Sequence, residues 1–176
     1  MRMAQNKKEE IFCFDSSTFI KLHRSYGEDL IPEIWQELEN LFKNEKIISH
    51  TVVFEELTTS TKKDALSKWI SSKKRYFKKM SGNQAVHVSN ILKIFPGLID
   101  ANNEKDQADP WLIALTLEEK SKTSLFTSEK EYYIVSEESI RSPHRIPAVC
   151  EHFGIKHLSL KDFFKYNGWQ LSMQKK

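Results

Sequence analysis

Short apolar runs recur along this chain, separated by longer segments whose apolar residues follow helical spacing. Each run is about as long as a strand and apolar on both sides, as is typical of strands buried inside a parallel sheet. The predicted strands cover residues 11–15, 46–49, 132–136 and 155–158.

The segments between these runs favour helices. Apolar residues at 29–44 and 83–95 fall on one helical stripe each. Asp109-Pro110 opens a helix in which 111–117 is apolar nearly all round, as expected of an element packed at the centre. Strands that alternate with helices predict an α/β fold of three αβα layers, with a mostly parallel central sheet. Further helices are predicted at about 17–25, 51–59, 62–75, 147–153 and 160–166, and a polar stretch at about 118–131.

The composition is that of one globular domain rather than a disordered chain, with 39% hydrophobic and 29% charged residues. We expect a single domain at 11–170 between flexible ends, 1–10 and 171–176. No apolar run approaches the roughly 20 residues that span a membrane, so we expect no membrane partner. Cys13 and Cys150 lie in apolar patterns and are interpreted as core thiols in a reducing cytoplasm. The net charge of +3 permits a nucleic-acid partner without requiring one.

Acidic residues fall where the predicted strands end and the following helices begin. In a doubly wound sheet this edge is where ligands bind. Carboxylates gathered there cannot all stay ionised without a compensating cation, and Mg²⁺ or Mn²⁺ prefers such oxygen ligands. Such an ion can lower the pKa of a water for in-line attack on a phosphodiester. The acidic residues are Asp15, Glu55, Glu56, Asp106, Asp109, Glu137 and Glu138.

Several segments together resemble the PIN-domain nucleases, specifically a PIN-like branch of bacteria and archaea. The resemblance runs from about residue 11 to 170, and it depends on the order and spacing of the segments rather than on one motif. The segments are Phe14-Asp15-Ser16-Ser17, Ile48-Ser49 through Glu55-Glu56-Leu57, Ala108-Asp109-Pro110-Trp111, Ile134-Val135-Ser136-Glu137-Glu138, Arg145-Ile146-Pro147, Phe153-Gly154-Ile155 and Gly168-Trp169.

The resemblance implies catalytic and metal-binding roles for four carboxylates: Asp15, Glu56, Asp109 and Glu138. Asp106 is implied as a further metal ligand one turn before Asp109. Glu55 is the alternative to Glu56, and Ser17, Ser136 and Glu137 are expected to support the site. At the fourth acidic place the family often has Asp or Asn, where this chain has Glu138. The segment Phe126-Thr127-Ser128-Glu129 competes for that place, and the better strand before Glu138 favours the latter.

The implied function is a metal-dependent endoribonuclease, a hydrolase of RNA phosphodiester bonds that uses Mg²⁺ or Mn²⁺. The resemblance also implies a toxin of a toxin–antitoxin pair, with RNA as substrate, an antitoxin protein as partner, and a homodimer. The alternative is a non-catalytic PIN-like module that binds nucleic acid or protein. A phosphohydrolase of another doubly wound fold is disfavoured, because Asp15-Ser16-Ser17 lacks the Asp-x-Asp that such enzymes usually carry.

One segment, 68–79, concentrates positive charge and interleaves it with aromatic residues. Lysine and arginine neutralise phosphates and aromatic rings stack on bases, so RNA contact is one interpretation. The other is an amphipathic helix whose aromatics face the core, with Trp69 a core residue under both. The nucleic-acid-binding candidates are Lys73, Lys74, Arg75, Lys78 and Lys79.

Structural interpretations compete with the catalytic ones at single positions. Asp15 and Asp109 are each suited to cap a helix N-terminus, a role compatible with holding a metal ion. Cys150, His152 and His157 lack the spacing of a zinc site. His50 follows a predicted strand and could touch phosphate, but a surface role is favoured for it.

Overall fold

A five-stranded parallel sheet forms the centre of the computed structural model, which describes residues 8–59, 64–103, 105–125 and 130–169. The strand order is β3-β2-β1-β4-β5, so β1 is central and both of its neighbours run parallel to it. The strands are β1 (Glu9–Phe14), β2 (Ile47–His50), β3 (Phe77–Lys78), β4 (Lys130–Val135) and β5 (Lys156–Leu158).

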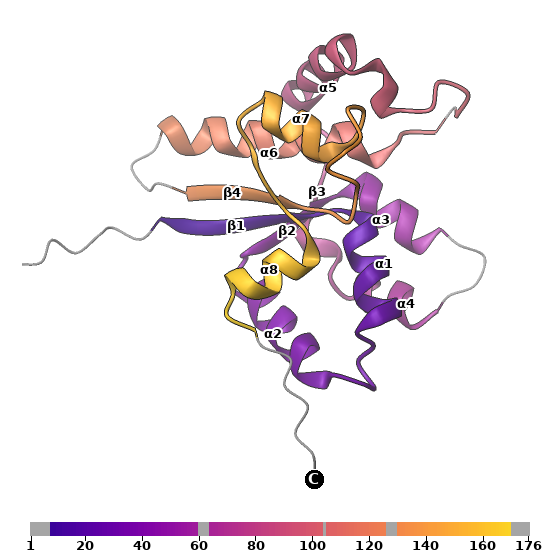
Figure 1. Cartoon of the computed structure of the whole chain (residues 1–176), viewed down its shortest axis with the longest axis vertical. Coiled ribbons are helices and arrows are strands. Elements are labelled where there is room, and N and C mark those ends of the chain that lie inside the picture. The colour runs from indigo at the N-terminus through magenta and orange to yellow at the C-terminus, as the bar shows by residue number, and fades with distance from the viewer. Residues whose placement is uncertain (1–7, 60–63, 104, 126–129, 170–176) are drawn as a thin grey trace, which may run out of the picture.

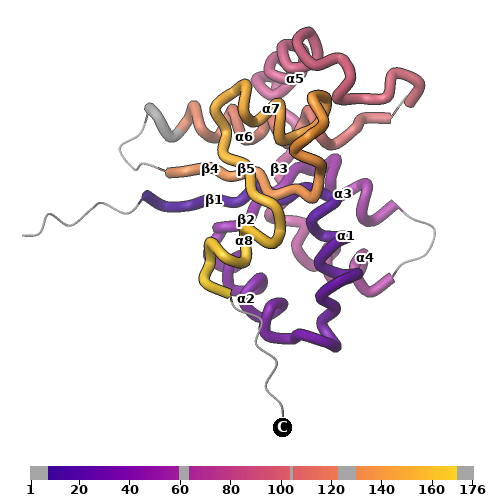
Figure 2. Tube along the Cα trace, in the orientation of Figure 1, coloured from indigo at the N-terminus to yellow at the C-terminus, as the bar shows by residue number. Residues whose placement is uncertain are grey.

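Helices cover both faces of this sheet, which confirms the predicted three-layer αβα fold with a parallel central sheet. Figure 1 shows α5, α6 and α7 on one face and α1, α2, α4 and α8 on the other. In Figure 2 the chain passes from α7 through β5 to α8 and so changes face. The helices are α1 (Ser16–Ser25), α2 (Pro32–Lys43), α3 (Thr51–Thr58), α4 (Ala65–Ser71), α5 (Gly82–Ile94), α6 (Ala108–Leu125), α7 (Ile146–His152) and α8 (Leu160–Tyr166).

Two apolar clusters form because successive side chains of a strand point to opposite faces of the sheet. In β1, Phe12 and Phe14 pack with α1, α2 and α8, whereas Ile11 and Cys13 pack with α6 and α7. Both cysteines are free and buried, and burial raises the pKa of the Cys13 thiol to about 12. Strand β4 alternates in the same way, with Tyr133 and Val135 in the first cluster and Tyr132 and Ile134 in the second.

Two parts of the chain differ from the sequence prediction. The helix predicted at 62–75 ends at Ser71 and is followed by a 3-10 turn and then β3, which pairs in parallel with β2. A strand of two residues leaves no periodicity to detect, and only its pairing with β2 defines it. The helix predicted over 111–117 continues through part of the polar stretch 118–131 as far as Leu125, because the Leu, Glu and Lys residues there are strong helix formers.

None of the helices in the described residues is both long and apolar enough to cross a membrane.

Replacing Phe12 by alanine is expected to destabilise the protein by about 3–5 kcal/mol, the usual cost of emptying a buried aromatic site. Phe12 is 2% exposed, and its ring centroid lies 5.4 Å from that of Tyr133 and 4.9 Å from that of Phe163. Urea unfolding of both proteins measures the difference. Leu30→Ala is the control, because Leu30 is 73% exposed and should change stability by less than about 0.5 kcal/mol. Equal losses in the two variants would contradict this account of the core.

Candidate active site

A pocket of about 460 Å³ opens at the carboxyl ends of the parallel strands. Its lining includes five carboxylates. Asp100 belongs to the loop between α5 and α6, and the other four come from four separate parts of the chain. Asp15 directly follows β1, Glu56 lies on α3, Asp109 is in the first turn of α6, and Glu138 follows β4. The opposite wall is formed by the loop between α5 and α6. The structure therefore brings together Asp15, Glu56, Asp109 and Glu138.

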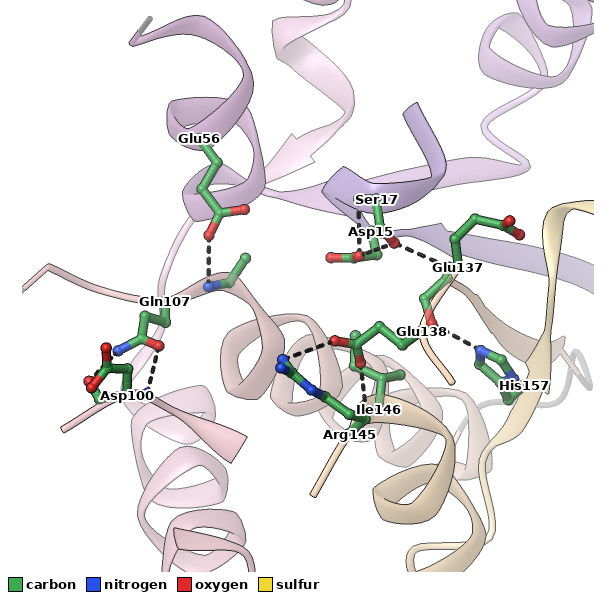
Figure 3. Close-up of polar contacts among 12 residues, drawn as sticks. Asp15, Ser17, Glu56, Asp100, Gln107, Glu137, Glu138, Arg145, Ile146 and His157 are labelled. Carbon is green, nitrogen blue, oxygen red and sulfur yellow. Dashed lines mark hydrogen bonds and ion pairs between the residues drawn. The ribbon is translucent and has the colours of Figure 1, made fainter. Parts of the chain in front are cut away.

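Asp15 lies deepest in the pocket, with only 2% of the residue exposed. It is the N-cap of α1: its Oδ2 accepts hydrogen bonds from the Ser17 backbone N–H at 3.0 Å and the Ser17 hydroxyl at 2.5 Å. The Ser17 hydroxyl in turn accepts from the Glu137 backbone N–H at 3.0 Å (Figure 3). Within the described residues, the buried Oδ1 has no hydrogen-bond partner. Such a buried, unpaired oxygen is costly unless a ligand satisfies it.

The side chains of the adjacent residues Glu137 and Glu138 contact different helices, α8 and α7 respectively. Glu138 Oε2 accepts from the Ile146 backbone N–H at 2.7 Å, and its Oε1 lies 3.3 Å from Arg145 Nη1, beside the pocket (Figure 3). Glu137 Oε1 instead accepts from the Leu160 backbone N–H at 2.8 Å and stabilises the start of α8. Of the two, Glu138 faces the pocket. The competing Glu129 lies outside the described residues.

In two further acidic pairs, Glu55 with Glu56 and Asp106 with Asp109, only one member lines the pocket. Glu56 Oε1 accepts from the Ala108 backbone N–H at 3.1 Å, at the first residue of α6. Glu55 and Glu56 are both exposed residues, but only Glu56 is part of the pocket lining. Asp106 is likewise exposed and outside the lining. Asp109 lines the pocket but is not an N-cap, because α6 already begins at Ala108.

Three helix N-termini converge on the pocket, and each is satisfied by one of its carboxylates. Asp15 accepts from the first turn of α1, Glu56 from the first residue of α6, and Glu138 from the first residue of α7. The positive end of a helix dipole favours a negative charge at this place. Each carboxylate is therefore positioned by one oxygen while its second oxygen is left for other contacts.

Despite these helix N-termini, the pocket disfavours ionisation of all of its carboxylates at once. Burial is the largest effect, and with the negative charges of Asp15, Glu138 and Glu56 it raises the pKa of Asp109 to about 8, against the opposing charge of Arg145. Burial also raises the pKa of Asp15, Glu56 and Glu138, and hydrogen bonds to each carboxylate oppose the shift. These four groups are thus coupled through one electrostatic field. Without a cation, one or more of them tends to hold a proton.

The donor set suits a hard divalent cation, because all four groups are carboxylates and Asp15 has a buried oxygen without a partner. Across the described residues, however, no three Asp, Glu, His or Cys side chains are already gathered as tightly as direct ligands of one ion. The carboxylates line the walls of a pocket that also has room for water.

His50 connects three of the elements around the pocket. It is fully buried, so the surface position expected from the sequence is wrong. Its Nδ1 accepts from the Val52 backbone N–H at 3.1 Å and caps α3, and its Nε2 lies 3.1 Å from Gln84 Oε1 on α5. Its ring stacks on Trp111 of α6 at 5.5 Å. Burial lowers the His50 pKa, so the ring is neutral, and its role is to hold α3 and α6 in register.

Ser136 and His157 form a second buried contact close to the site. Ser136 directly follows β4, is fully buried, and its hydroxyl lies 2.9 Å from His157 Nε2 (Figure 3). Burial lowers the His157 pKa, so this ring is also neutral. The pair connects the end of β4 to β5 and so fixes the backbone from which Glu137 and Glu138 extend.

The basic segment 68–79 divides into residues committed to the fold and residues open to solvent. Lys73 forms an ion pair with Glu39 at 2.6 Å and lies over the Trp69 ring, so it is held in place. Tyr76 and Phe77 are buried, which favours the core interpretation of the aromatics over base stacking. Lys74 lies over Phe54 and Arg75 over Tyr76, whereas Lys78 and Lys79 are exposed.

Sequence reasoning gave no role to three groups that line the pocket. Arg145 was recognised only as part of a family segment, although its place just before a helix start and seven residues after Glu138 could have indicated it. Ser16 lies beside Asp15 and Glu56. The wall residues, which lie within 97–103 and at Gln107, were given no role, because no local pattern in the sequence shows that they lie against the carboxylates. In this loop Gln107 and the backbone of Asp100 bond reciprocally at 2.8 Å (Figure 3).

The three-layer αβα fold and its carboxylate pocket define the class of protein: an α/β protein with an acidic site at the carboxyl edge of the sheet. The chain belongs to the family described as "Domain of unknown function (DUF4411)", whose model matches residues 12–171. Among solved structures, it is similar to a chain in "Crystal structure of VapBC2 from Rickettsia felis bound to a DNA fragment from their promoter". That chain is 14% identical, with a TM-score of 0.48 and coverage of 85% of this chain and 98% of that chain. None of the curated proteins matches this chain.

The Asp109 pKa of about 8 lies above the usual 3.8, so ionising Asp109 costs more in the folded protein than in the unfolded chain. Its contribution to stability is therefore largest below pH 4 and is lost as the pH rises toward 8. In EDTA, Asp109→Asn should be more stable than wild type at pH 8, by on the order of 2 kcal/mol, and the gain should shrink toward pH 4. Urea unfolding at several pH values measures it, with the exposed Asp106→Asn as control. A difference that does not change with pH would refute the electrostatic account.

Proposed function

We propose that this protein is a metal-dependent endoribonuclease that hydrolyses RNA phosphodiester bonds at the carboxylate pocket, with Mg²⁺ or Mn²⁺ as cofactor. The observation that supports this most directly is the convergence of Asp15, Glu56, Asp109 and Glu138 on one pocket, with a buried Asp15 oxygen left unpaired. The chain uses no Ser, His or Cys nucleophile in this scheme. The resemblance to PIN-domain nucleases supports the same activity.

Asp15, Glu56, Asp109 and Glu138 are the residues that would hold the cation. When bound, the ion supplies positive charge that offsets the carboxylates and the charge developing on the phosphodiester. Asp15 is held rigidly by Ser17, so its Oδ1 presents a fixed oxygen at the base of the pocket. Glu56 and Glu138 are fixed by backbone N–H groups on opposite sides. A cation held there would favour the ionised form of Asp109, whose pKa is raised to about 8 by burial and by the neighbouring carboxylates.

Lys78 and Lys79 are positioned to guide RNA toward this pocket. Strand β3 pairs in parallel with β2, with Lys78 opposite His50, so both lysines lie at the carboxyl edge of the sheet. This is the edge at which the pocket opens. Their exposed charges can neutralise phosphates of a single strand without any rearrangement of the core.

The PIN resemblance extends the proposal to the toxin of a toxin–antitoxin pair. RNA cleavage by such a protein would arrest the growth of cells that express it without its antitoxin. The antitoxin and a homodimer are the protein partners that this interpretation implies.

Two neighbouring glutamates provide a matched test of the pocket. Glu56→Gln should lower the rate of Mn²⁺-dependent RNA cleavage by roughly 100-fold or more, because Glu56 lines the pocket. Glu55→Gln removes the same charge one residue away, outside the lining, and should cleave at nearly the wild-type rate. Asp15→Asn should abolish cleavage while the protein remains folded by circular dichroism. The measurement is single-turnover cleavage of a labelled RNA.

The same variants provide a test in cells. Growth arrest on expression should disappear with Asp15→Asn and persist with Glu55→Gln. Wild-type protein that binds RNA but leaves it intact with Mn²⁺ and with Mg²⁺ would instead support the non-catalytic module. Equal activity of the Glu55 and Glu56 variants would show that the pocket is not the site of cleavage.

Reversing the charge of Lys78 and Lys79 together should weaken RNA binding by about tenfold or more. The slope of log affinity against log salt should also become shallower by about 0.7 for each lost phosphate contact. Lys43→Glu with Lys46→Glu is the matched control, because these residues precede β2 at the opposite edge of the sheet. Fluorescence anisotropy across a salt series measures both quantities. The same loss of affinity in both double variants would indicate a diffuse charge effect and not a binding edge.

A further inference from the structure

Arg145 has an unusual position for a positively charged residue in this fold. Among the described residues that line the carboxylate pocket, it alone carries a positive charge. Its Nη1 lies 3.3 Å from Glu138 Oε1, and its charge lowers the pKa of both Glu138 and Asp109. Figure 3 shows the guanidinium extending toward the Glu138 carboxylate. The pocket therefore already contains one cation, supplied by the chain itself.

The backbone of Arg145 is fixed while its guanidinium is only loosely held. Ile146, the next residue, donates its backbone N–H to the other Glu138 oxygen at 2.7 Å, which anchors the base of the side chain beside the site. The Arg145 side chain is 55% exposed, and its contact with Glu138 involves a single long hydrogen bond. An ion pair of this kind contributes little to stability and exchanges partners readily.

Both a polyanionic substrate and a dication would weaken the ion pair between Arg145 and Glu138. A dication near Glu138 satisfies the carboxylate and weakens its hold on Arg145. A phosphodiester entering the same pocket offers the planar guanidinium a pair of oxygens, which it binds with better geometry than the single Glu138 contact. Without a positive group near them, the non-bridging phosphate oxygens would face four carboxylates.

We propose that Arg145 is a catalytic residue of the proposed RNA hydrolysis: it leaves Glu138 when a dication binds and contacts a non-bridging oxygen of the scissile phosphodiester. This inference rests on the proposed function. In the hydrolysis, a water oxygen bonds to phosphorus as the bond to the leaving sugar oxygen breaks. The attacking water loses its proton to solvent, and the leaving oxygen gains one from solvent. Arg145 keeps its protons throughout and stabilises the charge on the phosphoryl oxygens.

Arg145→Ala, Arg145→Lys and the control Arg141→Ala test this role. Arg141 is exposed in the same loop but does not line the carboxylate pocket. With Mn²⁺, Arg145→Ala should lower kcat by roughly 100-fold. Arg145→Lys should recover part of that loss, because it restores the charge but not the planar pair of donors. Arg141→Ala should cleave as wild type does. The Arg145 side chain caps no helix, so the variants should fold, and their thermal midpoints check this.

RNA binding without turnover distinguishes exchange of partners from a purely structural role. Affinity for a labelled RNA is measured by anisotropy in EDTA and in Ca²⁺, with a gel to verify that the RNA stays intact. In Ca²⁺, Arg145→Ala should bind RNA about tenfold more weakly than wild type. In EDTA the difference should be much smaller, because Glu138 then still occupies the guanidinium. Calorimetry should show that Mn²⁺ binds Arg145→Ala at least as tightly as wild type.

Each failure has a different meaning. If wild type cleaves RNA and Arg145→Ala cleaves and binds equally well, this inference is wrong and the proposed function stands. If Arg145→Ala loses the same affinity in EDTA as in Ca²⁺, the exchange between Glu138 and phosphate is wrong. If wild type neither cleaves nor binds RNA, both proposals are wrong.

Discussion

The structure depends on how it holds several negative charges close together in a place shielded from water. Such carboxylates repel one another, and burial raises the cost of each charge. The fold offsets this cost by directing three helix N-termini at the pocket. Asp15, Glu56 and Glu138 each accept a hydrogen bond from the first turn of a different helix. The carboxylates thus hold the helices at the sheet edge, and the helices hold the carboxylates.

This arrangement explains why a mainly structural feature is also suited to chemistry. A helix N-terminus needs only one oxygen of a carboxylate, so the second oxygen remains available. Asp15 is the clearest case, because Ser17 occupies Oδ2 twice while the buried Oδ1 has no partner within the described residues. The remaining electrostatic cost appears at Asp109, which lies in the first turn of α6 but whose pKa is raised to about 8 by burial and by the neighbouring carboxylates. The carboxylates are fixed by hydrogen bonds, but their negative charge is not fully compensated. Such a site favours a cation.

The sequence pattern was sufficient to predict the three layers and the sheet edge at which the carboxylates lie. The alternation of strands and helices shows where each strand ends. It could not distinguish neighbouring acids such as Glu55 and Glu56. A helix turns by about 100° per residue, so adjacent side chains face different directions, and only packing decides which one faces the pocket. Strand β3 and the wall residues within 97–103 and at Gln107 were missed for a related reason. Both are defined by contacts with distant residues and leave no local periodicity.

Arg145 illustrates the limit of motif reasoning most clearly. The sequence placed it in a family segment, yet a motif gives residue type and order and does not show which side chains meet. The structure adds that Glu138 has two neighbours, the Ile146 N–H at 2.7 Å and the Arg145 guanidinium at 3.3 Å. The extra methylene of Glu relative to Asp helps one side chain reach an amide eight residues ahead while its other oxygen stays beside the pocket. The departure from the usual Asp or Asn is therefore consistent with a carboxylate that anchors a helix and holds a cation, first the chain's own guanidinium and then, in our proposal, a metal ion.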